Sequence, residues 1–304
     1  MTSSTKGNGS QNDGLRFGEL AIDYSELPEL SQYTARDGVV LPVRHYPLEP
    51  PATSDRVLVL IHGSGYHSRY LMPLAERIAA SGAAQVYTPD LRGHGSSPAR
   101  RGDIDYVDQL EDDLADLITH IRESNAGARI FVGGHSSGGG LALRFAGSRH
   151  RSMSAGFALL APFLRHDAPT SRSNAGGWAR PKTARIVALA ILNAMGVSRF
   201  DNTVVIEFVM PEEVRDGTET LAYTHRLNTG LAPRHYESDF EAIDTPLLVL
   251  VGDDDEAFIA DKFPETVSRH APDAVVEIVV DASHMGIVAG EASAEMLIRW
   301  LETR

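Results

Sequence analysis

The chain has 304 residues, with 28 Lys and Arg against 41 Asp and Glu, so its formal net charge at pH 7 is -13. This negative charge argues against nucleic acids and anionic membrane surfaces as main partners, because both would repel it. Cysteine is absent, which excludes disulfides, thiolate metal sites and a cysteine nucleophile, and fits a reducing compartment. We therefore expect a cytoplasmic protein that uses other side chains for chemistry.

The N-terminal residues 1–28 are predicted to form a disordered tail without a function of their own. Residues 1–14 are rich in Ser, Thr, Gly, Asn and Gln and contain no apolar stretch. They therefore match neither a secretory signal nor a membrane span, and no other segment is long and apolar enough to cross a bilayer. We expect no integral membrane segment.

Strands and helices alternate over residues 29–164, which we interpret as the first part of an α/β core. Residues 30–46 predict a hairpin that turns at Asp37-Gly38. The continuous apolar run 56–61 suits a strand buried on both faces. It leads into the glycine-rich loop 62–66, where backbone N–H groups can point into a cleft and stabilise an oxyanion. A tight turn without chemistry is the alternative for this loop.

A helical pattern follows between Ile104 and Ile121, and it carries an unusual number of acids. A metal site is one interpretation of such a cluster. The acids lie away from the apolar stripe and partly near the helix N-terminus, where negative charge is favoured, so we expect a solvated face instead. The seven acids are Asp103, Asp105, Asp108, Glu111, Asp112, Asp113 and Asp116.

The stretch 130–143 contains the strongest single candidate for catalysis. An apolar strand is followed by Gly134-His-Ser-Ser-Gly138 and then by an apolar helix, which is the pattern of a nucleophile elbow. Glycines are needed there because a serine on a sharp strand-to-helix turn leaves no room for neighbouring side chains. The register makes Ser136 the nucleophile and Ser137 its neighbour, although ordinary loops also contain such short glycine-serine clusters.

The alternation of strands and helices breaks at residues 165–240, which predicts a helical cap inserted over the cleft. Five basic residues and one acid begin this segment, so we predict tolerance of anionic or phosphate-bearing substrates. The apolar helix at 185–192 is too short to span a bilayer. It either packs on the core or also lines a pocket for an acyl chain.

The sheet resumes in residues 241–304, with strands at 246–251 and 275–280. A serine nucleophile needs a histidine base, and that base needs a carboxylate to orient it. Loops that follow parallel strands meet at one sheet edge, so Ser136, an acid after the first of these strands and His284 after the second should converge. His284 is preferred over His62, His94 and His135 because it alone follows the acid-bearing strand. Asp255 is the preferred acid, followed by Asp254 and then Asp253.

Together these motifs resemble the α/β-hydrolase superfamily, and within it the monoacylglycerol lipase and lysophospholipase branch. The resemblance rests on His62-Gly-Ser-Gly-Tyr-His-Ser-Arg-Tyr70, Asp90-Leu-Arg-Gly-His-Gly-Ser96, the elbow, Gly252-Asp-Asp-Asp255 and Ser283-His284. It implies a mostly parallel eight-stranded sheet with helices on both faces and a helical cap after strand 6.

For the site, the resemblance implies a catalytic triad of Ser136, Asp255 and His284 without metal or cofactor. It also implies oxyanion donors from the backbone N–H groups of Ser64 and Ser137, with Tyr66 and Phe163 as candidate substrate-binding residues. Members of the branch commonly carry methionine at the position of Ser137. Because the donor is a backbone group, we expect catalysis to survive this change.

The predicted function is cleavage of carboxylic esters through an acyl-enzyme, with a small or lipid-like, monoacylglycerol-type ester as the substrate. Thioesters, lactones and amides would use the same triad and remain alternatives, as do carbon-carbon bond hydrolysis and a hydrolase-fold ligand receptor with little turnover. No nucleic acid partner is expected, and the sequence leaves open whether the chain forms a homodimer.

Overall fold

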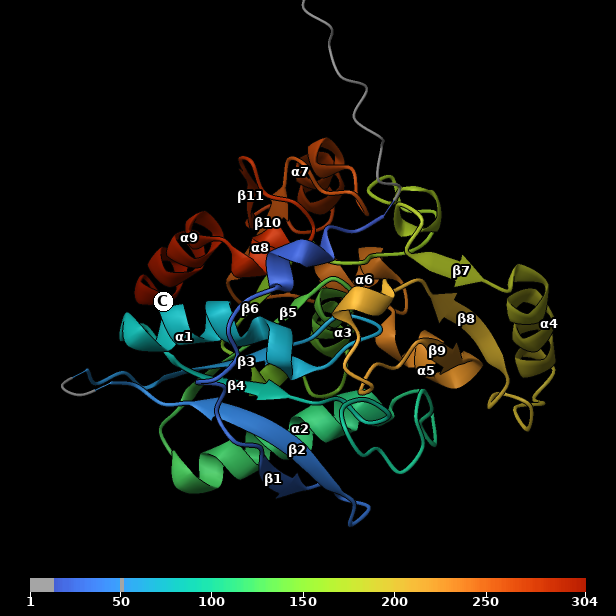
Figure 1. Ribbon diagram of the computed structural model, residues 1–304, viewed down its shortest axis with the longest axis horizontal. Helices are drawn as coiled ribbons and strands as arrows, with labels where there is room; N and C mark the ends of the chain where they lie inside the picture. The colour runs from blue at the N-terminus through green and yellow to red at the C-terminus, as the bar shows by residue number, and fades with distance from the viewer. Residues whose placement is uncertain (1–13, 50–51) are drawn as a thin grey trace, which may run out of the picture.

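The computed structural model describes residues 14–49 and 52–304, and its centre is a mixed sheet of eight strands (Figure 1). Strand β2 is antiparallel to both of its neighbours, β1 and β4, whereas every pair from β4 to β11 is parallel. This confirms the predicted mostly parallel sheet. In spatial order the strands are β1 (Ser31–Thr34), β2 (Val40–Tyr46), β4 (Gln85–Pro89), β3 (Arg56–Ile61), β5 (Arg129–His135), β6 (Gly156–Leu160), β10 (Leu247–Gly252) and β11 (Val275–Val279).

Helices cover both faces of this sheet, as right-handed crossovers require when the strand order reverses direction. From β3 the chain steps to β4 in one direction and then returns past β3 to β5, so α1 and α2 lie on opposite faces. Helix α9 packs beside α1, and α3 packs beside α2. The core helices are α1 (Met72–Ala80), α2 (Gln109–Ser124), α3 (Ser137–Ala146), α7 (Phe263–Ser268), α8 (Gly286–Ala289) and α9 (Glu291–Glu302).

The central strands are buried on both faces because their sequences are apolar at nearly every position. All residues of β6 and β10 are buried, and β3 and β5 are buried from their second residue on. The predicted hairpin at Asp37-Gly38 joins β1 to β2. In the part of the chain that the structure describes, no helix combines the length and the apolar character needed to cross a bilayer.

The prediction of a disordered tail is wrong for residues 14–28; residues 1–13 lie outside the described part of the chain. Phe17–Leu20 form a single 3-10 turn, and the side chains of Leu15 and Phe17 are buried in the hydrophobic core. The Phe17 ring packs against Trp178, with 5.1 Å between the ring centroids. A partner more than 150 residues away in the sequence therefore orders this segment.

Residues 165–240 were predicted to be helical, but they also contain a small antiparallel sheet. Its strands are β7 (Ala179–Pro181), β8 (Val204–Phe208) and β9 (Ala222–Thr224), with β8 in the middle. The helices of this region are α4 (Thr183–Ala194), α5 (His225–Leu231) and α6 (Tyr236–Glu241). The apolar helix α4 packs on β8 of this small sheet and not on the main core, since only its Leu189 is buried. It contributes no residue to the cavity that adjoins Ser136.

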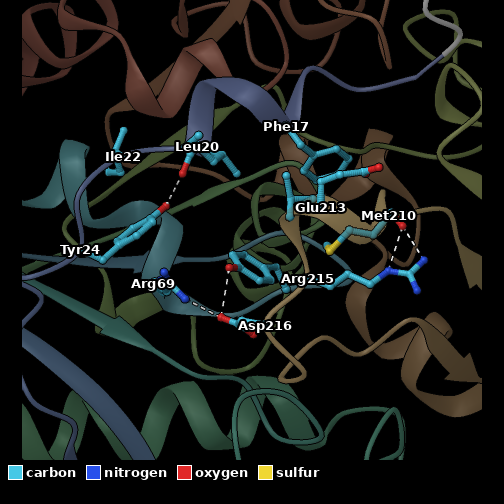
Figure 2. A pocket seen from close by; sticks show the side chains of 12 residues that line it. Phe17, Leu20, Ile22, Tyr24, Arg69, Met210, Glu213, Arg215 and Asp216 are labelled. Atoms are coloured by element: carbon cyan, nitrogen blue, oxygen red, sulfur yellow. Dashed lines mark hydrogen bonds and ion pairs between the residues drawn. The ribbon is translucent and has the colours of Figure 1, made fainter.

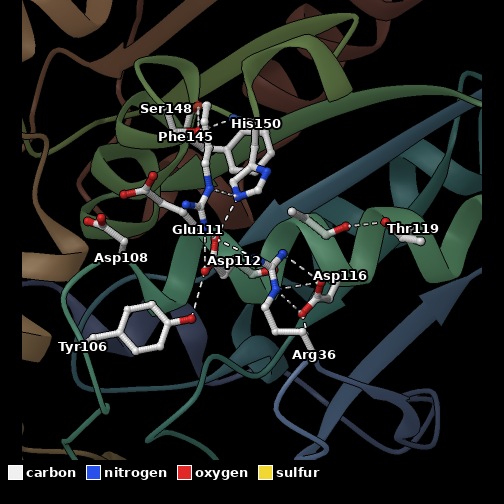
Figure 3. Close-up of polar contacts among 12 residues, drawn as sticks. Arg36, Tyr106, Asp108, Glu111, Asp112, Asp116, Thr119, Phe145, Ser148 and His150 are labelled. Atoms are coloured by element: carbon white, nitrogen blue, oxygen red, sulfur yellow. Dashed lines mark hydrogen bonds and ion pairs between the residues drawn. The ribbon is translucent and has the colours of Figure 1, made fainter.

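The acidic cluster is only partly a solvated face. Asp105 and Asp108 are exposed, but Asp103, Glu111, Asp112 and Asp113 are buried. Each buried acid is paired with at least one arginine from another part of the chain, which compensates the cost of removing a carboxylate from water. In Figure 3, Asp112 lies between Arg36, Tyr106 and His150.

One of these ion pairs is buried where helices α2 and α3 meet the loop that precedes α6. Arg144 of α3 and Glu111 of α2 form an ion pair whose two side chains are 2% and 3% exposed. The same carboxylate binds Arg234, 2.6 Å away, from the loop between α5 and α6. Glu111 therefore connects residues 165–240 to the core.

Candidate active site

Ser136 lies on the sharp turn between β5 and α3, as expected of a nucleophile elbow. Its backbone has φ +56° and ψ -121°, a strained conformation for a residue with a side chain. Three hydrogen bonds hold the turn. The Ser136 N–H donates to Leu160 O at 2.9 Å, and its carbonyl accepts from Phe163 N–H at 2.9 Å and Gly140 N–H at 3.0 Å. The neighbouring strand β6 and the loop after it therefore fix the serine.

Ser136, His284 and Asp255 form a continuous chain of hydrogen bonds. The Ser136 Oγ lies 3.0 Å from His284 Nε2, and His284 Nδ1 lies 2.8 Å from Asp255 Oδ2. The second carboxylate oxygen of Asp255 accepts the N–H groups of Ala257 and Phe258, each at 2.8 Å. Both Asp255 and His284 are buried, at 2% and 1% exposed, so the carboxylate is oriented in a site shielded from water.

The other two candidate acids lie elsewhere. Asp254 is exposed and pairs with Arg16 at 2.6 Å, and Asp253 is exposed and makes no contact with His284. Glu256 was not predicted to belong to the site, but its Oε2 accepts the backbone N–H of His284 at 2.9 Å. Its position directly after the acid loop was the only signal that could have singled it out.

The three other candidate histidines support the surrounding loops, and none of their rings makes a hydrogen bond to the Ser136 hydroxyl in the described part of the chain. Each makes one hydrogen bond as donor and one as acceptor, so each is neutral. His62 accepts the Leu91 N–H at 3.1 Å, His94 accepts the Tyr223 hydroxyl at 2.6 Å, and His135 Nε2 donates to His284 O at 2.9 Å. Burial lowers the pKa of His62 to about 4 and that of His94 to about 3. Burial and then the neighbouring His284 hold the pKa of His135 well below its usual range.

Two tyrosines that were not among the predicted site residues organise the glycine-rich loop. The Tyr70 hydroxyl accepts the Gly63 N–H at 2.6 Å, and the Tyr223 hydroxyl accepts the Gly65 N–H at 2.8 Å. Within residues 14–49 and 52–304, neither the Ser64 N–H nor the Ser137 N–H has an acceptor. Two backbone donors therefore remain for a bound group next to Ser136.

A mostly apolar cavity of about 80 Å³ opens beside Ser136 on the side of residues 165–240. Phe163 lines it, together with Ser64, Ser137 and aromatic residues that include Trp178 and Phe208. Tyr66 lies on the other side of Ser136, with His284 and Phe17.

The basic residues that begin the cap segment do not line this cavity. Arg165 pairs with Asp167 and Glu237, and Lys182 pairs with Glu207. Arg172 instead donates to the backbone carbonyls of Asp255, at 3.3 Å, and Phe258. The positions of these basic side chains therefore do not support the predicted tolerance of anionic substrates.

The strand order, the elbow and the loops that meet at one sheet edge define an α/β-hydrolase. A profile of the family described as serine aminopeptidase, S33, matches residues 52–285. The match covers more than half of the chain, which therefore belongs to this family. The resemblance predicted from the motifs is thereby confirmed at the level of the superfamily.

Known relatives point to the monoacylglycerol lipase branch. The chain is 29% identical to the monoacylglycerol lipase of Mycolicibacterium smegmatis over 212 residues, which are 69% of this chain and 74% of that enzyme. It is 28% identical to human monoglyceride lipase over 144 residues, covering 47% of this chain and 45% of the human one. The protein is therefore a carboxylic ester hydrolase related to monoacylglycerol lipases.

A solved structure supports the fold. A soluble variant of monoglyceride lipase from Saccharomyces cerevisiae, in complex with a substrate analogue, matches with a TM-score of 0.69. The match covers 91% of this chain and 95% of the yeast chain at 19% identity. At this level of identity the similarity concerns the fold and leaves the substrate undefined.

Proposed function

We propose that the protein hydrolyses esters through a triad of Ser136, His284 and Asp255. His284 removes the hydroxyl proton as Ser136 Oγ bonds to the ester carbonyl carbon, and the Ser64 and Ser137 N–H groups stabilise the oxyanion. His284 then donates that proton to the leaving alcohol oxygen as the carbon-oxygen bond breaks. Water, deprotonated by His284, cleaves the acyl-enzyme and releases the acid.

The observation that carries this proposal is the pair of contacts at His284, 3.0 Å to Ser136 Oγ and 2.8 Å to Asp255 Oδ2. Both lie within the reach needed for proton transfer and for orienting the imidazole. The two backbone donors without acceptors support an oxyanion site. No step needs a metal or a cofactor, because an activated hydroxyl and two N–H groups suffice for acyl transfer.

Replacement of the nucleophile tests the proposal directly. We expect Ser136→Ala to lower kcat for p-nitrophenyl butyrate by about 10⁴-fold or more, since the residual rate comes from binding and the oxyanion site alone. The variant should also lose covalent labelling by a fluorophosphonate probe. Ser124→Ala, at the exposed end of α2, is the matched control and should keep both activities. Turnover by Ser136→Ala at the wild-type rate would contradict the triad.

We further propose that residues 165–240 act as a cap that forms the acyl site. Support comes from the cavity beside Ser136, where Trp178, Ile206, Phe208 and Leu231 provide apolar walls. Apolar walls favour an acyl chain, and the relatives named monoacylglycerol lipases suggest esters of a lipid-like kind. The cavity beside Ser136 has a volume of about 80 Å³, which is smaller than the ~150 Å³ of an engineered cavity that binds benzene. We therefore propose a short acyl chain of a few carbons.

Chain-length selectivity tests the acyl site. Across p-nitrophenyl esters from acetate to decanoate, we expect kcat/KM to be highest for the short acyl groups. Phe208→Ala enlarges the cavity and should shift the maximum toward longer chains, by about 10-fold in relative kcat/KM. A wild-type preference for decanoate, unchanged in the variant, would rule out this acyl site while leaving the triad intact.

A further inference from the structure

The N-terminal segment Leu15–Leu20 lies directly against the candidate active site. We propose that it forms the leaving-group side of the site and holds the two loops that carry Asp255 and His284. This inference rests on the proposed triad, because it assigns a side of the site according to the role of His284 as proton donor to the alcohol.

The first argument is the set of polar contacts between this segment and both loops. Arg16 pairs with Asp254 at 2.6 Å and with Glu256 at 3.1 Å. Glu256 in turn accepts the backbone N–H of His284 at 2.9 Å. Glu256 thus connects Arg16 to the backbone of His284. Arg16 also contacts both residues that flank Asp255 in the sequence, Asp254 and Glu256.

A second contact reaches the histidine loop from the other direction. The Glu19 carboxylate accepts a hydrogen bond from the Ser283 hydroxyl, and Ser283 directly precedes His284. The same hydroxyl accepts the Gly286 N–H at 2.9 Å, where α8 begins. Glu19 therefore restrains the loop on both sides of His284. Substitution of Glu19 should affect the placement of the imidazole and not substrate binding.

The second argument concerns the two cavities that meet at Ser136. In the proposed reaction the leaving oxygen must lie within hydrogen-bond reach of His284 Nε2. The cavity of about 80 Å³ is lined by Ser136 but not by His284, whereas the space on the other side is lined by both. The leaving alcohol therefore belongs on the second side, whose walls include Leu15, Phe17 and Leu20.

This second side leads outward into a groove of about 240 Å³, shown in Figure 2. Phe17, Leu20 and Tyr66 line both the groove and the space beside Ser136, where only about 10 Å³ is open. These three side chains separate the groove from Ser136, so replacing one of them with a smaller residue should admit larger alcohols.

The charges of the groove indicate which alcohols it takes. Arg69 pairs with Asp216 at 2.5 Å and lies over the Tyr24 ring, and Arg215 donates to the Met210 carbonyl at 2.9 Å (Figure 2). These guanidinium groups are already engaged, and the carboxylate of Glu213 also lines the groove, so an anionic alcohol is disfavoured. With apolar side chains as the remaining walls, the groove suits an uncharged apolar or aromatic alcohol.

The decisive experiment compares leaving groups on one acyl chain. 4-Methylumbelliferyl butyrate and methyl butyrate give the same butyryl-enzyme, so deacylation is common to both and only acylation depends on the leaving group. For Phe17→Ala we expect the ratio of kcat/KM, bulky over small, to rise about 10-fold. The deacylation rate should not change. Phe200→Ala, an exposed aromatic of the cap, is the matched control and should keep the wild-type ratio.

A second pair of variants tests the hold on the loops. Glu19→Ala should lower kcat several-fold for both esters with little change in KM, and Glu19→Gln should restore most of the loss, because its amide oxygen can still accept from Ser283. Glu123→Ala, an exposed acid of α2, is the control. A purely structural role of Glu19 would show as a loss of stability and not as this rescue of kcat.

The possible outcomes separate this inference from the proposed function. An unchanged leaving-group ratio in Phe17→Ala, with Ser136→Ala inactive, overturns the role of the N-terminal segment and leaves the triad standing. Full turnover by Ser136→Ala overturns the triad itself. A leaving-group ratio that rises in Phe17→Ala while deacylation stays constant supports the inference.

Discussion

The sheet edge around Ser136 and the cap segment 165–240 differ sharply in how their residues are held. At the sheet edge even the polar side chains are buried and hydrogen-bonded, as His62, His94 and His135 illustrate. In the cap, helix α4 buries only Leu189, while Val187 and Ile191 are more than half exposed.

This difference separates two tasks. The three neutral histidines each connect neighbouring loops, so the position of Ser136 relative to His284 depends on many buried contacts. The outer part of the cap makes few such contacts and can vary in sequence without disturbing the reacting atoms. We therefore expect catalysis to depend on the sheet edge and selection of the acyl chain on the inner surface of the cap.

After the loss expected for Ser136→Ala, the largest effect is expected at Asp255, the proposed catalytic acid. Asp255→Asn should lower kcat by about 10³- to 10⁴-fold, because an amide at this position favours the wrong tautomer of His284. Asp253→Asn, an exposed neighbour in the same loop, should stay near wild type in an ester hydrolysis assay. Equal losses in the two variants would mean that the loop, and not the carboxylate of Asp255, matters.

The next largest effect concerns Glu111, which pairs with Arg144 of the core and with Arg234 of residues 165–240. Glu111→Gln leaves Arg144 buried without its carboxylate, and we expect a loss of about 3–5 kcal/mol in the free energy of unfolding. Asp108→Asn removes an exposed partner of the same arginine and should cost about 1 kcal/mol or less. Urea denaturation measures both. Similar values for the two variants would contradict the importance of burial.

A dependence of stability on pH should distinguish the sheet edge from the cap. The pKa values of His62 and His94 are lowered by burial to about 4 and about 3, so the unfolded chain takes up protons first. Their contribution to stability is present above about pH 6.5 and is lost as the pH falls toward 4, with a slope of about 1.4 kcal/mol per pH unit for each histidine.

His94→Gln tests this dependence. Glutamine keeps a hydrogen-bonding side chain but cannot be protonated, so unfolding free energies measured from pH 7 to pH 4 should fall less steeply than in the wild type. His120→Gln replaces a histidine whose side chain is 46% exposed and should leave the slope unchanged. The idea fails if the two variants have the same slope.

The smallest effect is expected on the outer face of the cap. Val187→Ser and Ile191→Ser replace exposed side chains of α4 and should change the unfolding free energy by about 0.5 kcal/mol or less. Leu189→Ala, the buried position of the same helix, should cost about 2 kcal/mol or more. Comparable losses at positions 187 and 189 would mean that α4 packs against something further.

The sequence was sufficient to predict the sheet, the elbow and the hydrogen-bonded set of Ser136, His284 and Asp255. These depend on local patterns: apolar runs that suit buried strands, glycines that a sharp turn requires, and loops that follow parallel strands. Asp255 and His284 could be selected because each follows a recognisable strand.

The features that were missed depend on partners that are far away in the sequence. Glu111 was predicted to be exposed because its partners Arg144 and Arg234 lie outside the helix that carries it. Phe17 was assigned to a disordered tail because Trp178, against which it packs, belongs to the cap. Strands β7 and β9 have three residues each, too few for a visible alternation of apolar and polar positions.

The glycines that follow Ser136 limit how this enzyme can be engineered. A side chain at Gly138 would collide with the backbone of Ile61 and His62, and one at Gly140 would meet the Phe163 carbonyl at 2.6 Å. Mutant libraries that aim at new ester substrates should leave this helix start unchanged. Substitutions at Trp178 and Phe208 would alter the proposed acyl site while Ser136 keeps its position.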